Sequence, residues 1–242
     1  MTQNIYDDPG FFAGYSRLQR SVDGLAGAAE WPAMRALLPD MKGLDVADLG
    51  CGFGWFCRWA AEQGAAGVLG LDVSEKMLER ARCETMDMRV RYDRADLEKL
   101  RLAGASFDLV YSSLAFHYIE DFAGLLATIR QALKPGGRLI FSIEHPIYMA
   151  PRQPEWQVDA EGGNIWPLSA YQIEGKRLTN WLAEGVVKQH RTMATTLNLL
   201  IRSGFIIAHV EEWSPSDDDL AAHPDWVTER ERPMFLLIST QT

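Results

Sequence analysis

Residues 44–54 read Leu-Asp-Val-Ala-Asp-Leu-Gly-Cys-Gly-Phe-Gly, and this stretch decides the fold of the chain. The β-branched residue in the apolar run 46–49 and the glycine that ends the run favour a buried strand over a helix. Glycine permits a sharp turn and lets a ligand approach the backbone with no Cβ in the way. Residues 55–63 then predict a helix that ends at Gly64. The stretch is therefore expected to form a strand, a glycine loop and a helix whose first N–H groups face a ligand.

Composition narrows the class of protein. The chain has 242 residues and a formal net charge of −9, which argues against binding to the phosphate backbone of nucleic acids and favours a small-molecule enzyme. The first residues lack the basic and apolar regions of a signal peptide, and no apolar run approaches the length of a membrane span. The three cysteines form no Cys-x-x-Cys pair. We therefore expect free thiols and a cytoplasmic location.

Strand and helix patterns alternate after the glycine loop. Strands are expected at 67–72, 88–92, 107–111 and 138–143, with helices at about 74–82 and 121–133. This alternation predicts an α/β fold, a parallel sheet with helices on both faces. Two final strands are expected at 205–210 and 234–239, and the linker between them lacks the long helix of a parallel crossover. The final pair is therefore predicted to be antiparallel.

The rest of the chain divides into segments of a single domain, 1–242. Residues 1–40 are expected to be helical, with a helix at 32–38 and an amphipathic helix at 11–25 that either packs on the core or forms a lid over the glycine loop. Residues 41–145 form the core. Residues 146–191, rich in proline, glycine and tryptophan, predict an insertion in which 168–182 pairs with 186–191. Residues 192–242 carry a helix and the last two strands.

Acidic residues follow the predicted strands where a ligand would bind. In a doubly wound sheet, ligands bind outside the carboxyl ends of the strands, at the point where the strand order reverses. Asp72, 22 residues after Gly50, suits a carboxylate that accepts two ribose hydroxyls. Asp96 is placed to meet an adenine amino group, with Leu97 on one face of the ring, although Asp96 as a helix cap is the alternative. Met77 suits the other face of the base.

The spacing of the glycines separates two kinds of nucleotide ligand. The dinucleotide fingerprint G-x-G-x-x-G requires a glycine at position 55, where this chain has Trp55. Asp48, just before the glycines, is badly placed for a pyrophosphate but suits a cationic amino group. An NAD-linked oxidoreductase is therefore the weaker alternative. A non-catalytic cofactor-binding protein on the same fold also stays open, because fold alone does not determine function.

These features together resemble the class I S-adenosylmethionine-dependent methyltransferases, nearest to the small-molecule enzymes of ubiquinone and menaquinone biosynthesis. The matching motifs, all within residues 44–145, are D-x-G-x-G-x-G at 48–54, the acid at 72, Ala-Asp-Leu at 95–97 and Leu-Lys-Pro-Gly-Gly at 133–137. The resemblance implies a Rossmann-like sheet of seven strands with an antiparallel last strand. It also implies in-line transfer of the sulfonium methyl group of S-adenosyl-L-methionine to a small-molecule acceptor, leaving S-adenosyl-L-homocysteine.

The same resemblance assigns roles to the cofactor residues. The glycine loop would contact the methionyl part, Asp72 the ribose, and Asp96 with Leu97 the adenine. Ser112 would line the pocket beside the sulfonium, and Tyr15 would close over the cofactor. The cofactor-binding set predicted in this way is Tyr15, Asp48, Gly50, Gly52, Gly54, Asp72, Val73, Met77, Asp96, Leu97 and Ser112.

Two histidines are candidate catalytic bases. His117 and His145 follow the fourth and fifth strands on the ligand side. Histidine is the natural general base near neutral pH, but a structural histidine with satisfied hydrogen bonds is an equal alternative. No metal site is expected, because the acidic run 217–219 lacks companion ligands and is typical of a solvated loop or helix cap.

The insertion is expected to wall the acceptor site. Tyr148 and Trp181 suggest an aromatic or largely apolar acceptor. His190 and Arg191 end the insertion, and strand alternation would place them on opposite faces, one of them in the site and able to bind an acidic acceptor. The sequence determines neither the methylated atom (O, N or C) nor the oligomeric state.

Overall fold

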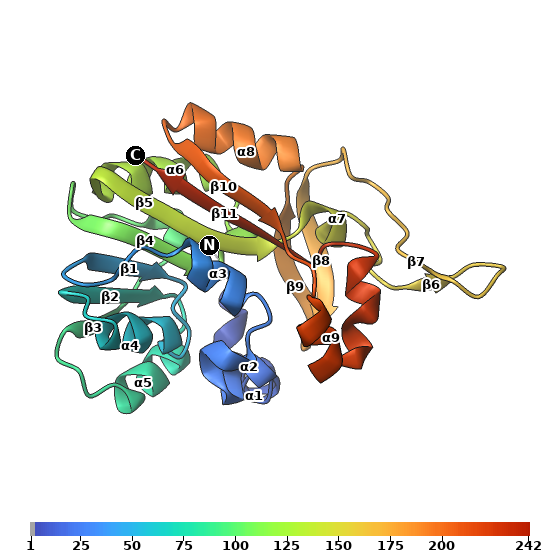
Figure 1. Cartoon of the computed structure of the whole chain (residues 1–242), viewed down its shortest axis with the longest axis horizontal. Helices are drawn as coiled ribbons and strands as arrows, with labels where there is room; N and C mark the ends of the chain where they lie inside the picture. The colour runs from blue at the N-terminus through green and yellow to red at the C-terminus, as the bar shows by residue number, and fades with distance from the viewer. Residues whose placement is uncertain (1–2) are drawn as a thin grey trace.

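The computed structural model describes residues 3–242, and its central element is a seven-stranded sheet of order β10-β11-β5-β4-β1-β2-β3 (Figure 1). Strands β1 to β5 pair in parallel, whereas β11 is antiparallel to both β5 and β10. This confirms the doubly wound sheet and its antiparallel last strand. The strands are β1 Asp45–Leu49, β2 Gly67–Asp72, β3 Val90–Arg94, β4 Phe107–Ser113, β5 Leu133–Glu144, β10 Ile206–Glu212 and β11 Phe235–Gln241.

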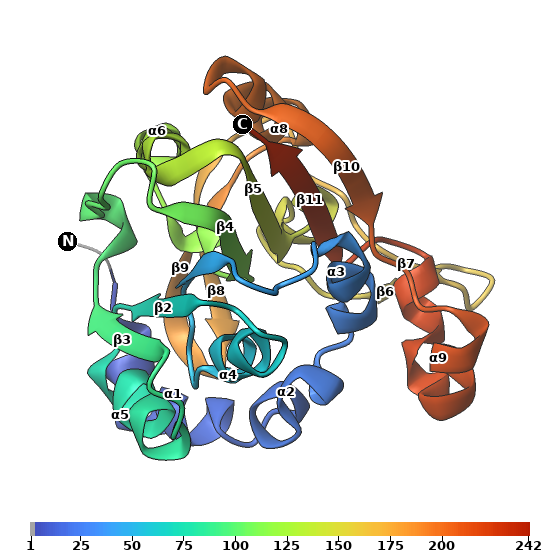
Figure 2. The same ribbon diagram turned by 60° about the vertical axis from the view of Figure 1, so that its left-hand side comes forward.

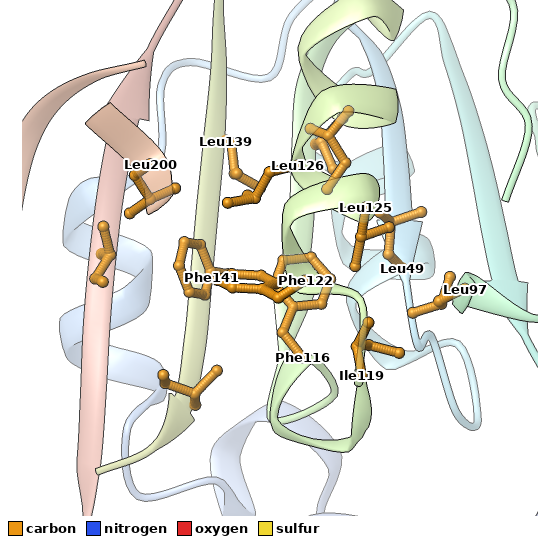
Figure 3. Packing of buried hydrophobic residues seen from close by; sticks show 14 of the residues in the cluster. Leu49, Leu97, Phe116, Ile119, Phe122, Leu125, Leu126, Leu139, Phe141 and Leu200 are labelled. Carbon is orange, nitrogen blue, oxygen red and sulfur yellow. The ribbon is translucent and has the colours of Figure 1, made fainter. Parts of the chain in front are cut away.

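Helices cover both faces of this sheet (Figure 2). Helices α3 (Trp31–Leu37), α4 (Trp55–Glu62) and α5 (Glu75–Glu84) contribute to one buried cluster, and α6 (Phe122–Ala132) and α8 (Met193–Arg202) to the other. Strand alternation supplies both clusters, since Val46 of β1 belongs to the first and Ala47 and Leu49 to the second. Figure 3 shows the second cluster, in which the rings of Phe116, Phe122 and Phe141 gather beneath α6.

The expected caps begin the helices that follow β2 and β4. The Ser74 side chain accepts a hydrogen bond from the Met77 N–H at the start of α5, and the Asp121 side chain accepts one from the Gly124 N–H at the start of α6. Each cap satisfies an N–H group that has no partner within its helix. Because β1 lies between β2 and β4, its carboxyl end is the switch point of the sheet, and the glycine loop lies there.

The single amphipathic helix predicted at 11–25 is wrong. Three short elements replace it, α1 (Pro9–Tyr15), α2 (Gln19–Val22) and η2 (Gly24–Gly27), and η1 (Ile5–Asp7) precedes them. Leu18 is extended between α1 and α2, and Val22, expected on the buried face, is 58% exposed. Gly24 has a φ of +61°, which does not continue a helix, and a Cβ there would lie 2.5 Å from the Trp55 ring. Helix α3 forms where it was expected.

The insertion forms two small hairpins. Short strands β6 (Gln157–Val158) and β7 (Asn164–Ile165) make an arm that extends away from the sheet in Figure 1. Strands β8 (Gly175–Trp181) and β9 (Ala183–His190) pair antiparallel, as the sequence predicts. The remaining elements are η3 (Leu97–Lys99), η4 (Phe116–Tyr118), α7 (Pro146–Met149), α9 (Asp217–Ala222) and η5 (Pro224–Arg230). Within residues 3–242, no helix combines the length and apolar character needed to span a membrane.

Candidate functional site

A pocket of about 420 Å³ lies at the carboxyl ends of β1, β2, β4 and β5, and we call it the main pocket because most of the predicted cofactor residues line it. The N-terminal segment and the β8–β9 hairpin complete its walls. It therefore occupies the crevice where ligands bind in doubly wound sheets. Of the residues predicted from the sequence, those that line it are Tyr15, Asp48, Gly50, Gly52, Asp72, Val73, Met77, Leu97, His117, Tyr148 and Trp181.

The first two loop glycines serve different purposes. Gly50 has a φ of +81°, and a Cβ there would lie 2.4 Å from the Cβ of Ala115, so the residue allows close packing. Gly52 has a φ of +53°, and a Cβ there would meet nothing within 4 Å. Gly52 therefore leaves open space beside the pocket, as a site of close ligand approach requires.

Asp72 joins the second strand to the glycine loop. Its Oδ2 accepts a hydrogen bond of 2.9 Å from the Gly52 N–H, and its Oδ1 accepts one of 2.9 Å from the Ser74 N–H. Burial raises the pKa of this carboxyl, while the backbone donors favour its charged form. Each carboxylate oxygen keeps capacity for a second donor, so the group can hold the loop and accept ligand hydroxyls together.

Asp48 is an almost fully buried carboxyl beside the loop, 2% exposed. The Cys57 thiol donates to its Oδ2 over 3.3 Å. Burial raises the pKa of Asp48 to about 7, and the negative charge of Asp72 acts in the same direction. A ligand cation at this position would favour the ionised form and offset the loss of hydration.

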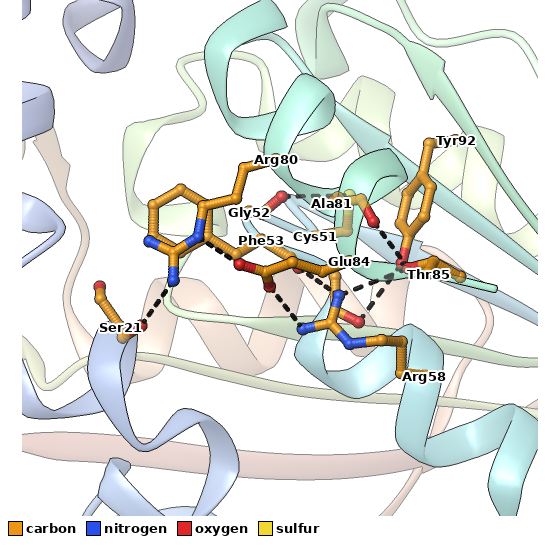
Figure 4. A network of polar contacts seen from close by, with 11 residues as sticks. Ser21, Cys51, Gly52, Phe53, Arg58, Arg80, Ala81, Glu84, Thr85 and Tyr92 are labelled. Atoms are coloured by element: carbon orange, nitrogen blue, oxygen red, sulfur yellow. Dashed lines mark hydrogen bonds and ion pairs between the residues drawn. The ribbon is translucent and has the colours of Figure 1, made fainter.

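A polar network fastens the outer side of the glycine loop (Figure 4). Arg58 donates to the Phe53 carbonyl at 2.7 Å and to Glu84 at 3.2 Å. Arg80 donates to Glu84 at 2.7 Å and to the Ser21 carbonyl at 3.3 Å, and its guanidinium lies 3.9 Å from the Phe53 ring centroid. The loop is thereby linked to α4, α5 and α2.

Three of the predicted cofactor residues lie outside the lining of the main pocket. Gly54 has a φ of +73° at the start of α4, and a Cβ there would lie 2.1 Å from the Tyr92 hydroxyl, so this glycine is needed for packing. Ser112 donates to the Leu49 carbonyl at 2.7 Å, and its neighbour Ser113 lines the pocket instead, because successive side chains of a strand point to opposite faces.

Asp96 is the third. Its Oδ1 accepts a hydrogen bond of 3.1 Å from the Glu98 N–H and caps η3, which is the alternative stated for it from the sequence. Asp96 borders a second pocket, while the adjacent Leu97 lines the main one.

The two histidine candidates differ in placement. His117 lines the main pocket, and its Nδ1 accepts a hydrogen bond of 3.3 Å from the Glu144 N–H. Burial lowers the pKa of His117 to about 4, so the imidazole is neutral at pH 7 and a weak base. His145 lies outside the pocket lining. Its Nδ1 accepts from the Ile147 N–H at 3.1 Å and its Nε2 bonds Glu212 at 2.8 Å, so both ring nitrogens serve the structure.

The acceptor roles predicted for His190 and Arg191 do not match their positions, since both border the second pocket and neither lines the main one. The His190 Nε2 bonds the Tyr171 carbonyl at 2.8 Å. The Arg191 guanidinium donates to the carbonyls of residues 119 and 120. Strand β9 ends at His190, so the alternation used to orient the pair does not extend to Arg191.

Several residues of the main pocket were missed from the sequence. Arg20 and Glu30 form an ion pair in which the Glu30 side chain is buried and the Arg20 side chain is partly exposed, and the Ser113 hydroxyl donates to Glu30 at 3.0 Å. The hydroxyls of Tyr6 and Tyr118 lie 3.2 Å apart. No periodic pattern marks these residues. Glu144 was also missed, although it ends β5, and the rule about strand carboxyl ends would have found it.

Comparison with known proteins gives consistent results. A family model described as a methyltransferase domain matches residues 47–141. The crystal structure of an S-adenosylmethionine-dependent methyltransferase from Mesorhizobium loti is similar with a TM-score of 0.88 and 62% identity, covering 90% of this chain and all of that one. An uncharacterised Haemophilus influenzae protein is 39% identical over 98% of this chain and 96% of its own length.

A more distant similarity concerns an enzyme with a named substrate. The malonyl-[acyl-carrier protein] O-methyltransferase of Erwinia pyrifoliae is 44% identical over 101 residues. That match spans 41% of this chain and 37% of the relative, so more than half of each chain lies outside it.

Proposed function

We propose that this chain, which belongs to the class I S-adenosylmethionine-dependent methyltransferases, methylates a small molecule bound in the main pocket beside the cofactor. The observation that carries the proposal is the Asp72 carboxylate, which is bonded to the Gly52 N–H on the pocket wall. S-Adenosylmethionine supplies an activated methyl group when bound, so the protein has to bind, align and shield the reactants.

The charges of the pocket suit this cofactor. We assign Asp72 to the ribose hydroxyls and the apolar surfaces of Met77 and Leu97 to the base, because all three residues line the pocket. The methionyl part carries an ammonium and a carboxylate group. We assign the ammonium to Asp48 and the carboxylate to Arg20, which both line the pocket.

The remaining walls are proposed to position the acceptor. Trp181 of β8, Tyr148 of α7 and Tyr118 of η4 line the pocket together with the N-terminal segment. Holding the acceptor in line with the transferred methyl group can supply roughly 7–11 kcal/mol of the barrier reduction in favourable cases. Proximity is therefore the main contribution, because the neutral His117 is a weak base.

Isothermal titration calorimetry tests the proposal. Both S-adenosylmethionine and S-adenosylhomocysteine are expected to bind with Kd values on the order of micromolar at pH 8, a free energy of about −8 kcal/mol. NAD, titrated as the competing nucleotide, is expected to give no heat, because the loop lacks the third glycine of the dinucleotide spacing. Binding of NAD alone would reject the methyltransferase assignment of the site.

The same titration, repeated from pH 8 to pH 5.5, tests the ammonium site. The pKa of Asp48 in the free protein is raised to about 7, and a bound cation requires the ionised carboxylate. Affinity is therefore expected to weaken as the pH falls below 7, by up to about tenfold per pH unit, because protons compete with the ligand. Asp48→Asn should weaken this pH dependence, leaving only the part that comes from the raised pKa of Asp72, and Asp93→Asn, an exposed control, should preserve it in full. A flat profile in the unsubstituted protein would remove Asp48 from the ammonium role.

A further inference from the structure

Glu144 ends β5 and lines the main pocket with a carboxylate that is only partly used. Its Oε1 accepts a hydrogen bond from the Lys188 ammonium, and no hydrogen bond to its Oε2 comes from any residue in the range 3–242. The Lys188 side chain is buried and does not line the pocket. Lys188 therefore holds the Glu144 carboxylate from outside the pocket, and the Oε2 of Glu144 can accept a hydrogen bond from a ligand.

Aromatic side chains surround this part of the pocket. The Lys188 ammonium that bonds Glu144 lies 5.2 Å from the Trp181 ring centroid. Tyr15 and Trp181 meet edge to face at 6.2 Å, and Tyr6 meets Tyr15 in the same way at 5.2 Å. Burial raises the pKa of Tyr6 and Tyr15, so these rings remain neutral. Neutral aromatic faces beside a carboxylate are the surroundings that bind cations in proteins.

The charge balance of the pocket favours the same kind of ligand. Within the described part of the chain, four carboxylates line it: Glu30, Asp48, Asp72 and Glu144. Arg20 is the only lysine or arginine among those lining residues; it is paired with Glu30 and is proposed to bind the cofactor carboxylate, so the acceptor has no lining cation left to it. His117 is neutral, because burial lowers its pKa to about 4. Glu30 and Glu144 are each ion-paired, whereas no ion pair within the described residues involves Asp48 or Asp72, so the lining carries excess negative charge and favours a cationic acceptor over an anionic one.

We propose that Glu144 binds a positively charged amino group of the methyl acceptor, whose aromatic or apolar body lies against Trp181 and the tyrosine rings. This inference rests on the proposed function of the main pocket and specifies its substrate class. A cationic acceptor would distinguish this chain from the malonyl-[acyl-carrier protein] O-methyltransferase, whose similarity covers less than half of either chain. In this arrangement Lys188 orients the Glu144 carboxylate, and Trp181 forms the pocket wall against which the body of the acceptor packs.

The test compares three ligands that share a phenyl ring and differ in the charge of their head groups. Benzylamine, benzyl alcohol and benzoate are titrated by calorimetry into protein saturated with S-adenosylhomocysteine at pH 7.5. Benzylamine is expected to bind at least tenfold more tightly than benzoate, with benzyl alcohol between them. Glu144→Gln should reduce the benzylamine affinity about tenfold and leave benzoate unchanged or slightly stronger, because it removes the charge and keeps the shape of the side chain.

Two further variants keep the test decisive. Glu144→Asp retains the charge and should retain the preference for the amine. Glu184→Gln removes a negative charge from an exposed position on the same β8–β9 hairpin, outside the pocket, and should change nothing. Each variant is checked by thermal melting and by its affinity for S-adenosylhomocysteine.

The outcomes distinguish this inference from the proposed function. Failure of the unsubstituted protein to bind S-adenosylhomocysteine would overturn the proposed function. If that ligand binds, the inference about Glu144 is overturned by any of three results: benzoate binding as tightly as benzylamine, no measurable binding of benzylamine, or a Glu144→Gln variant that keeps the preference for the amine.

Discussion

Replacement of Asp72 by alanine is expected to weaken binding of S-adenosylhomocysteine by roughly a hundredfold. The carboxylate is proposed to accept two ribose hydroxyls, and a hydrogen bond to a charged group contributes about 1.5–3 kcal/mol. Loss of two such bonds at the lower value removes about 3 kcal/mol, which corresponds to the hundredfold change. The substitution also frees the Gly52 and Ser74 N–H groups that Asp72 holds at 2.9 Å, so the loop loses one of its links to β2 and keeps the backbone hydrogen bonds from Gly50 and Cys51 to the Leu71 carbonyl.

Calorimetry measures this effect, and Asp93→Ala is the matched control. Asp93 lies exposed on the neighbouring strand β3, where it pairs with Arg91 at 3.1 Å, and it does not line the main pocket. The control should bind S-adenosylhomocysteine as the unsubstituted protein does. Asp72→Asn, which keeps one acceptor oxygen, should fall between the two variants. If Asp72→Ala retained full affinity while remaining folded, the ribose role of Asp72 would be excluded.

The position of Asp72 could be predicted because the information is local. An acid that directly follows a predicted strand must lie at the carboxyl edge of the sheet, and parallel strands bring such residues into one crevice. The same reasoning located Gly52 and Leu97 on the main pocket. This reasoning was less accurate for Ser112 and Asp96, because a shift of one residue along the chain changes which side chain reaches the pocket. Strand alternation turns Ser112 away in favour of Ser113, and local capping of η3 engages the side chain of Asp96.

The acceptor side could not be derived from the sequence in the same way. Its walls come from segments without regular periodicity, namely the broken N-terminal helices and the insertion. The pair formed by Glu144 and Lys188 joins residues 44 positions apart, and the Arg20–Glu30 pair joins α2 to the start of α3 across η2. Such contacts are tertiary, so neither motif spacing nor amphipathicity encodes them. His145 also follows a strand, but its ring makes structural hydrogen bonds instead of facing the pocket. One ring nitrogen caps α7 and the other bonds Glu212.

Replacement of Gly50 by alanine is expected to destabilise the fold itself, by about 2–5 kcal/mol. A non-glycine residue at the φ of +81° found here incurs roughly 1–2 kcal/mol of backbone strain. The added Cβ would also lie 2.4 Å from the Cβ of Ala115, and overpacking of this kind costs about 1–3 kcal/mol. For a chain of this length the melting temperature should fall by roughly 4–20 °C in differential scanning calorimetry, since each kcal/mol corresponds to about 2–4 °C.

The Gly52→Ala variant distinguishes the role of a loop glycine in close packing from its role in allowing a ligand to approach the backbone. A Cβ at Gly52 meets nothing within 4 Å, so only the roughly 1–2 kcal/mol of strain at its φ of +53° remains, and the melting temperature should fall by about 2–8 °C. Cofactor affinity should nevertheless drop, because the new methyl group occupies the open side of the loop. In the double variant Gly50→Ala/Ala115→Gly, removal of the opposing methyl group should recover part of the stability, which a double-mutant cycle reports as a favourable coupling. Equal melting temperatures for Gly50→Ala and Gly52→Ala, with no coupling to position 115, would show that the tight contact beneath the loop is absent, and close packing would then not explain Gly50.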